Sequence, residues 1–522
     1  MADAGLYNNL DYPVKTLKAA DYGAVGDGVN DDGAAVSAAV KALSNCGPGS
    51  TLVFERNKTY YIGSLDSDAS ALFEFKGCKG LTVNGLNSKF ILDVKKSYVS
   101  IYGTKNCKIT GMTFDYATKP AFGAVCSSIK LTEGSALMVA DRDIGLKSGE
   151  IYTPPTGLSY WGVLNKSDSR YHMYITKYQM INRDKKTFRV YFDMTDNNTA
   201  SWLETNLSDS GMICPMPELG HLPEVERGFT IVENLDLILS DININSCCRF
   251  GMYIGRNEGT LTLDNVNFVP ADNELDRNLN FTSWRDAFHV KDNRCRVIWN
   301  NCTAVGNYDD VINISSSALY VSAYDEDTRS VSLVWPESST GLYYEIKPGD
   351  TLSVIDTSTG ADCGTVEVES VTEQSDGVNK IIIKTPLENF TSCGTQLLAY
   401  FANRCAPDSE ITDCNFNGTF RFRGPLTVSN STIYNMRTWI DVEGMREGPV
   451  PRDIKFIACD IAAGKSSSII IKSYNSSENG YHVSNISFEN CILEDSTLAI
   501  GSNDKGYVSL IDCKRHDGTN IE

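Results

Sequence analysis

Three aspartates have the residue types and the spacing that acid–base chemistry requires. Asp286 lies in the segment WRDAFHV, and Asp309 follows 23 residues later, next to Asp310 in the segment NYDDVINI. Crowded carboxylates repel one another and lose hydration, so at least one of them is expected to have a raised pKa. Such a group can donate a proton at neutral pH while its neighbours stay ionised and hold a water molecule, which is the division of labour in glycoside hydrolysis.

Two other interpretations of these aspartates compete with catalysis. Neighbouring residues on an ideal strand point to opposite faces, so Asp309 and Asp310 can act together only at a turn or a bulge. They could instead form a solvated turn, or a calcium site, because grouped carboxylates suit that ion. The apolar continuation Val311–Ile314 anchors the pair to a strand and favours catalysis. We expect neither a metal nor a cofactor.

The aspartates need a scaffold, and a repeated pattern around cysteines indicates which one. A polar residue, a cysteine and then alternating apolar residues recur, as at Asn106-Cys107, Asn301-Cys302 and Asn490-Cys491. Short apolar runs separated by turn residues about every eight to twelve positions predict repeated coils of strands. A β-sandwich would need more glycine-containing hairpins. We therefore predict an all-β, right-handed parallel β-helix in which each coil buries a small residue such as cysteine.

This scaffold would bring the three aspartates together. Residues one coil apart stack at the strand spacing of about 4.8 Å, so Asp286 can lie beside Asp309 and Asp310 on one face. The open end of such a solenoid needs a cover. Apolar residues at helical spacing in Gly33–Leu43, preceded by an aspartate that can serve as N-cap, predict a capping helix there.

Two stretches interrupt the coil rhythm and predict two inserted small β-barrel domains. The first contains the hairpin-like segment Tyr178–Phe192, and the second contains turn signals at Asp325–Asp327 and Ser375–Gly377. The expected division of the chain is a cap with the first coils at 1–125, a β-barrel at 126–227, central coils with the carboxylates at 228–317, a second β-barrel at 318–402, and C-terminal coils at 403–522.

Composition narrows the classes of partner. The 522 residues are 42% apolar and 22% charged, which is typical of a soluble folded protein, and the net charge is −19. This charge disfavours binding to nucleic acid and to anionic membranes. No apolar run reaches the roughly 18 residues of a transmembrane helix, so we expect no membrane insertion. An acidic polysaccharide stays open as a partner, because a local basic cleft can exist in an acidic protein.

The motifs resemble those of known β-helix families. The GAVGDG segment resembles the N-terminal cap of pectin-degrading and phage-tailspike proteins, and the aspartate spacing resembles that of polygalacturonases, whose GHG and RIK-like motifs are absent here. The order of motifs resembles glycoside hydrolase family 110, the inverting exo-α-galactosidases that remove terminal α-1,3-linked galactose. The motifs that carry this resemblance are Asp115–Gly123, Phe250–Gly255, Arg285–Val290, Asp309–Ile314 and Pro348–Leu352.

The family resemblance implies roles for individual residues. Asp286, Asp309 and Asp310 correspond to the catalytic carboxylates, with Asp309 expected to be the general acid and the other two to position water. Two departures bear on specificity: the family tends to read NVHG where this chain has Asn313–Ser316, and Asp441–Pro449 follows the family only loosely. By their place on these and later coils, the residues expected to contact the sugar are Arg285, His289, Arg421, Arg423, Trp439, Asp441 and Glu443. A structural role is the alternative for Arg285, His289 and Trp439.

The expected partner is therefore an oligosaccharide or glycan. A polysaccharide lyase is the main alternative, although the five histidines form no convincing cluster with Lys or Arg. A non-catalytic carbohydrate-binding β-helix is the second alternative. Met1–Leu10 lacks the features of a signal peptide, and the expected function favours a secreted or periplasmic protein whose leader is not part of this chain. The two inserts could mediate a homodimer.

Overall fold

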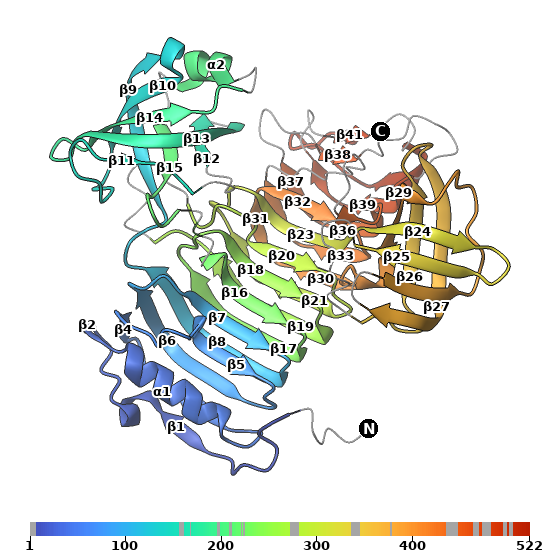
Figure 1. The fold of residues 1–522 in the computed structure, drawn as a ribbon, viewed down its shortest axis with the longest axis horizontal. Coiled ribbons are helices and arrows are strands. Elements are labelled where there is room, and N and C mark those ends of the chain that lie inside the picture. The colour runs from blue at the N-terminus through green and yellow to red at the C-terminus, as the bar shows by residue number, and fades with distance from the viewer. Residues whose placement is uncertain are drawn as a thin grey trace.

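The computed structural model shows a long parallel β-helix with two inserted domains (Figure 1). The helix α1 lies at one end of the stack, and the chain ends near the other. The structure describes residues 7–155, 161–166, 169–195, 199–207, 211–220, 222, 225–271, 281–335, 345–375, 378–434, 447–462, 469–471, 482–493, 498–500 and 505–521.

The capping helix is confirmed as α1 (Gly33–Ser44), but its N-terminus is held differently from the expectation. The side chain of Asp32 accepts hydrogen bonds from the backbone N–H of Val25 and of Gly26 and so closes the preceding loop. Asp31 Oδ1 instead accepts from the first N–H of the helix, at 2.9 Å. Among the described residues, no helix is long and apolar enough to cross a membrane.

Two sheets build the coils. One sheet contains, in parallel order, β5 (Ala71–Lys76), β7 (Ser97–Tyr102), β16 (Arg227–Val232), β18 (Phe250–Gly255), β20 (Phe288–Lys291), β23 (Asp310–Ser317) and β32 (Thr419–Phe422). The longer sheet includes β6 (Thr82–Leu92), β8 (Lys105–Tyr116), β17 (Leu235–Ile244), β19 (Glu258–Phe268), β21 (Arg296–Asn300), β30 (Ser409–Thr412), β33 (Leu426–Ser429), β36 (Arg452–Ile457), β39 (Ser484–Glu489) and β42 (Val508–Ile511). The chain alternates between them in right-handed crossovers, which confirms the predicted parallel β-helix.

Alternation along each strand separates the core from the outer face. In β20, Phe288 and Val290 are buried in the helix interior, whereas His289 and Lys291 are partly exposed. Cysteines occupy inner positions on successive coils as predicted, and all sixteen are free thiols. The backbone N–H of Cys302, for example, lies 3.3 Å from the sulfur of a cysteine on the next coil. The outer face of the β20 sheet is therefore the surface on which polar chemistry can be built.

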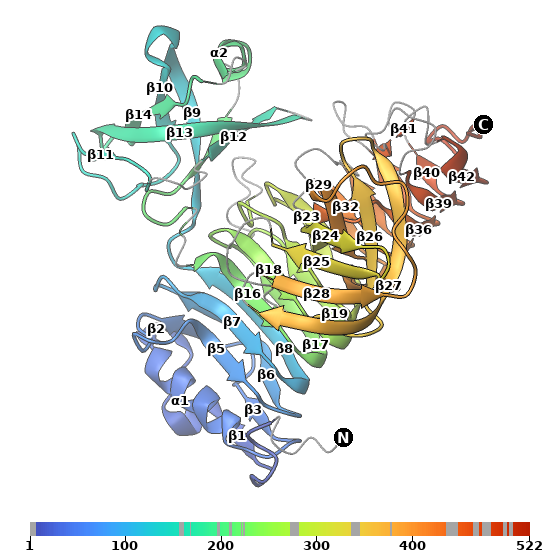
Figure 2. The same ribbon diagram turned by 45° about the vertical axis from the view of Figure 1, so that its right-hand side comes forward.

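Both predicted barrels are present (Figures 1 and 2). In the first insertion the pairings close a ring through β12 (Trp161–Lys166), β13 (Ser169–Asn182), β14 (Thr187–Phe192), β10 (Ser135–Ala140), β9 (Ala121–Lys130) and β15 (Gly211–Pro215). The second insertion is a closed barrel of β24 (Leu319–Asp325), β25 (Ser330–Val334), β28 (Val378–Ile383), β27 (Ala361–Ser375), β26 (Thr351–Asp356) and β29 (Gly394–Phe401). In both views the middle coils run between the two insertions.

Candidate active site

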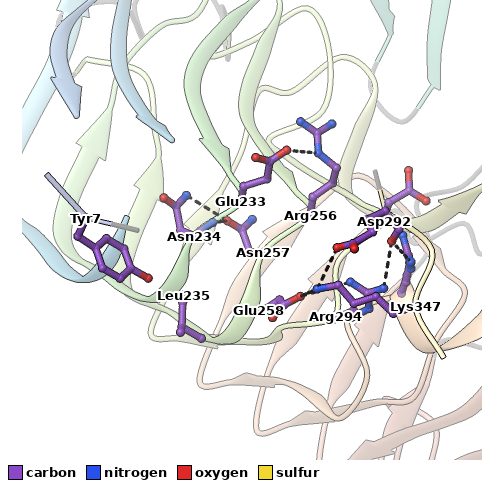
Figure 3. Close-up of a pocket in the computed structure, with 12 residues that line it drawn as sticks. Tyr7, Glu233, Asn234, Leu235, Arg256, Asn257, Glu258, Asp292, Arg294 and Lys347 are labelled. Carbon is purple, nitrogen blue, oxygen red and sulfur yellow. Dashed lines mark hydrogen bonds and ion pairs between the residues drawn. The ribbon is translucent and has the colours of Figure 1, made fainter. Parts of the chain in front are cut away.

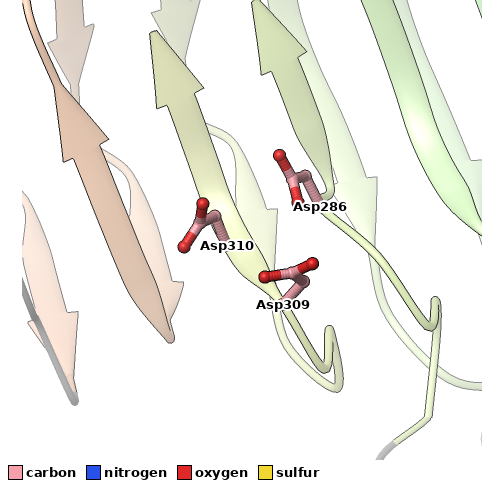
Figure 4. A group of neighbouring side chains, drawn as sticks. All are labelled: Asp286, Asp309 and Asp310. Carbon is pink, nitrogen blue, oxygen red and sulfur yellow. The ribbon is translucent and has the colours of Figure 1, made fainter. Parts of the chain in front are cut away.

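The β-helix brings the three predicted aspartates together at the N-terminal edge of the β20 sheet. Asp286 lies just before β20, Asp310 begins β23, and Asp309 lies in the segment that leads into it (Figure 4). One carboxylate oxygen of each residue lies within 4.8 Å of the others. The register between β23 and β32 shifts just after Asp310. This irregular strand start lets two adjacent aspartates turn towards the same site.

The three carboxylates differ in accessibility. The side chains of Asp286 and Asp310 are each 3% exposed, whereas that of Asp309 is 27% exposed. A substrate that approaches the outer face therefore meets Asp309 first. The two buried carboxylates lie behind it.

Cationic and amide groups hold these carboxylates in place. A guanidinium nitrogen of Arg285 donates to Asp309 Oδ2 at 3.0 Å, and Arg421 Nε lies 2.7 Å from Asp310 Oδ2. The amide of Asn313 also donates to Asp310, at 3.3 Å. Calcium prefers six to eight oxygen ligands, and here two guanidiniums already contact two of the three carboxylates. The donor set thus favours acid–base chemistry over cation binding.

Asp286 has a different partner, the imidazole of His289. Nδ1 of His289 lies 2.7 Å from Asp286 Oδ2, and the rings of Phe250 and Tyr253 pack against the imidazole at 5.0 and 5.7 Å between centroids. Burial lowers the pKa of His289 to about 4, so the ring is neutral at neutral pH. The contact therefore supplies Asp286 with a hydrogen-bond partner but with no positive charge.

Burial also changes the protonation of the two inner carboxylates. It raises the pKa of Asp286 well above its ordinary value, and the nearby charge of Asp309 adds to this shift. Burial raises the pKa of Asp310 in the same way, although Arg421 opposes the shift there. Both shifts favour the protonated form of the inner carboxylates. In such a coupled group the proton belongs to the cluster as a whole.

Glu447 is a fourth carboxylate of this site that the sequence did not reveal. It lies in β35 (Glu447–Gly448), which pairs with the end of β23, and accepts a hydrogen bond from Lys291 at 2.9 Å. Burial alone would raise its pKa, but Lys291 and the other polar neighbours of Glu447, Asn313 among them, together more than offset this, and the pKa of Glu447 lies well below its usual range. Asn313 donates to Glu447 at 3.1 Å as well as to Asp310. Glu447 is therefore ionised, and it holds Asn313, which also donates to Asp310, in place.

The first insertion also contributes to the site. The guanidinium of Arg285 lies 4.1 Å over the ring of Trp161 from β12. Trp161 belongs to an apolar cluster that joins the insertion to the segments around Asp286 and Asp309. The members of this cluster are Ala121, Trp161, Val163, Ile213, Phe281, Trp284 and Tyr308. The insertion thus fixes the arginine that contacts Asp309.

The other residues predicted to bind substrate have different outcomes. Arg285, His289 and Arg421 all contact the carboxylates directly. Arg423 is buried, and burial lowers its pKa. Trp439, Asp441 and Glu443 lie outside the described residues.

Replacing Asp286 by asparagine tests the protonation of this cluster. A carboxyl group whose pKa is raised on folding stabilises the native state below about pH 4, and this contribution is lost as the pH rises towards the folded pKa. The free energy of unfolding of Asp286→Asn, relative to the wild type, should therefore rise with pH from about 4 upwards, with a limiting slope on the order of 1.4 kcal/mol per pH unit. Urea unfolding at several pH values measures this difference. A difference that is constant or falls with pH would contradict the assignment.

A polar cavity of about 420 Å³ lies at the opposite edge of the same sheet (Figure 3). The charged groups that line it pair with one another: Arg256 with Glu233 at 2.9 Å, and Lys347 with Glu258 at 3.2 Å. Arg294 bridges from this cavity to a buried aspartate of the second barrel at 2.8 Å. The cavity is thus a salt-bridged junction between the β-helix and the barrel.

No family model and no curated protein matches the sequence. Solved structures of similar shape include a polygalacturonase from Erwinia carotovora ssp. carotovora (10% identity over 99% of this chain and 96% of that chain, TM-score 0.41). Others are the mannuronan C-5 epimerase AlgE4 A-module of Azotobacter vinelandii (11%, 96% and 95%, 0.33) and the surface adhesin PfbA of Streptococcus pneumoniae (11%, 96% and 91%, 0.36). At these identities and TM-scores the likeness carries no argument about function.

Proposed function

We propose that the protein is a glycoside hydrolase that removes terminal α-linked galactose from glycans. The cluster of Asp286, Asp309 and Asp310 carries this proposal, because it joins one accessible carboxylate to two buried ones within 4.8 Å. Burial raises the pKa of both inner groups. A site whose buried carboxylates favour a bound proton, beside a further carboxylate that a substrate can reach, has what hydrolysis of an acetal needs.

We assign the donor role to Asp309 because its side chain is the most accessible of the three. In this scheme the proton favoured by the inner carboxylates passes to Asp309, which protonates the glycosidic oxygen as the bond from that oxygen to the anomeric carbon breaks. Asp286 and Asp310 hold a water molecule, whose oxygen bonds to the anomeric carbon and whose proton passes to one of them. The products are a free sugar and an alcohol, and the cluster ends with the same number of protons.

Inversion of the anomeric centre rests on the resemblance of the motif order to glycoside hydrolase family 110. Two-carboxylate inverting enzymes place these groups roughly 6.5–9.5 Å apart to accommodate the water. Here the nearest oxygens lie within 4.8 Å, and a third carboxylate is present. The water would therefore have to be bound beside Asp286 and Asp310 and not between a distant pair. Whether the reaction inverts or retains the configuration is decided by which anomer of the sugar is released first.

The sugar and its α-1,3 linkage rest on the same resemblance. The expected partner is a glycan whose terminal galactose reaches the outer face of the β20 sheet.

Sugar release from a panel of oligosaccharides that end in α-galactose tests the proposal. We expect free galactose, with the β-anomer first in proton NMR spectra recorded at early times. If α-galactose appears first, the protein is a hydrolase that retains the anomeric configuration. If another terminal sugar is released, the protein is a hydrolase with a different sugar specificity. An unsaturated, ultraviolet-absorbing product would identify a lyase, and binding without any product would identify a carbohydrate-binding protein.

A further inference from the structure

A column of charged side chains extends from the carboxylate cluster along the edge of the β20 sheet. Glu226, Arg249, Arg285 and Asp309 occupy equivalent positions on four successive coils, each just before or at the start of a strand of this sheet. Inter-coil hydrogen bonds fix this alignment, for example from Arg285 N to Arg249 O at 3.1 Å. Coils are about 4.8 Å apart, so Arg249 lies roughly 10 Å from Asp309. That distance places it beside the cleaved linkage and not at it.

Arg227 and Arg249 carry more positive charge than their surroundings balance. Both lie near one carboxylate, that of Glu226, at 3.8 and 3.6 Å, which is longer than a hydrogen bond. Within the described part of the chain, the buried Nε atom of each guanidinium has no hydrogen-bond partner. Arg285 and Arg421, by contrast, have carboxylate partners at 3.0 and 2.7 Å.

The two arginines are also accessible and held in position. Their side chains are 34% exposed for Arg227 and 16% for Arg249. The guanidinium of Arg227 stacks at 3.8 Å on the ring of Tyr253, which in turn stacks on His289 beside Asp286. A guanidinium held over an aromatic ring can still present the N–H groups at its edge to a bidentate acceptor.

Positive charges crowd around Arg249. Burial lowers the pKa of Arg249, and the neighbouring Arg285 and Arg227 lower it further, although Glu226 opposes this shift. An anion placed between these groups would offset the repulsion among the guanidiniums, and carboxylates and sulfates have the planar or multidentate oxygens that suit arginine.

We propose that Arg227 and Arg249 bind an anionic substituent, a carboxylate or a sulfate ester, on the sugar next to the one that is cleaved. The proposal rests on the proposed function and deepens it by naming the class of glycan. The whole protein carries a net charge of −19, so the attraction is local to this edge of the sheet.

Calorimetric binding to full-length Asp286→Asn separates this proposal from catalysis. Asp286 contacts neither arginine among the described residues, so the substitution should stop turnover without altering the anion site. The probes are a uronate-containing galacto-oligosaccharide, a sulfated one and a neutral one of equal length. We expect at least one anionic probe to bind about tenfold more tightly than the neutral probe, and the probe that does so identifies carboxylate or sulfate.

Variants that remove a positive or a negative charge at this site should change anion binding in opposite directions. Arg227→Gln and Arg249→Gln in this background should each weaken binding of the anionic probe about tenfold, with little change for the neutral one. Glu226→Gln should tighten it, because among the described residues Glu226 is the only one whose carboxylate lies within 4 Å of these two guanidiniums. The control is Arg296→Gln, which loses the same charge at an exposed pair with Glu410 on the other sheet.

The outcomes distinguish the two proposals. Equal binding of all three probes, or equal effects of Arg249→Gln and Arg296→Gln on binding of the anionic probe, would contradict the anion site. If neutral galactosides are cleaved in that case, the proposed hydrolase activity still stands. Arginine-dependent binding of an anionic probe would support the anion site even if no galactose is released from any substrate.

Discussion

Replacing Asp309 by asparagine should lower kcat/KM for an α-galactosyl disaccharide by about 10³-fold, and Asp286→Asn and Asp310→Asn should have effects of similar size. Asparagine keeps the shape of each side chain and can still accept the contacts from Arg285 and Arg421. What it cannot do is gain or lose the proton that the reaction moves. Rates of galactose release from purified variants measure the effect.

The matched control is Asp264→Asn. Asp264 lies on β19 of the other sheet and accepts a hydrogen bond from Asn300 at 2.7 Å, so it is likewise a strand aspartate with an amide partner. It should keep nearly full activity. Circular dichroism and thermal unfolding should show that all four variants fold. Activity within tenfold of the wild type in both Asp309→Asn and Asp310→Asn would remove the catalytic role from this cluster.

The fold was accessible from sequence because its signals are local and repeated. The cysteine pattern marks inner positions coil after coil, and residues such as Cys302 are buried as that pattern requires. The capping helix follows from apolar spacing over Gly33–Leu43. The hydrogen-bond partners at its start were not accessible, because Asp31 and Asp32 are chemically equal and only the path of the loop decides which one contacts the helix.

The candidate site was accessible only in part. Asp286 and Asp310 lie one coil apart, so stacking alone predicts their proximity. Lys291 could have been found by the same logic, because it follows His289 by two positions on the outward face of β20. Glu447 and Trp161 could not have been found in this way. They lie in β35 and in the first barrel, and no sequence repeat relates those segments to the coils.

The accessible position of Asp309 leads to a second large effect, which depends on the leaving group. A general acid matters most when the departing alcohol is a poor leaving group, because proton transfer then lowers the barrier most. Asp309→Asn should therefore lose about 10³-fold in kcat/KM on an α-galactosyl disaccharide but only about tenfold on p-nitrophenyl α-galactoside, whose nitrophenolate leaves without protonation. Steady-state kinetics on both substrates measure the ratio.

Asp286→Asn and Asp310→Asn provide the contrast, since loss of a group that activates water slows both substrates alike. The buried positions of these two side chains favour that role, but the raised pKa of Asp286 favours the protonated form that an acid needs. If Asp286→Asn is the variant that is rescued on the aryl substrate, the acid is the inner carboxylate paired with His289. Asp309, held by Arg285, would then be the group that orients water. If no variant is rescued, protonation of the leaving group does not limit the reaction, and the proton retained by the cluster must serve the attack of water.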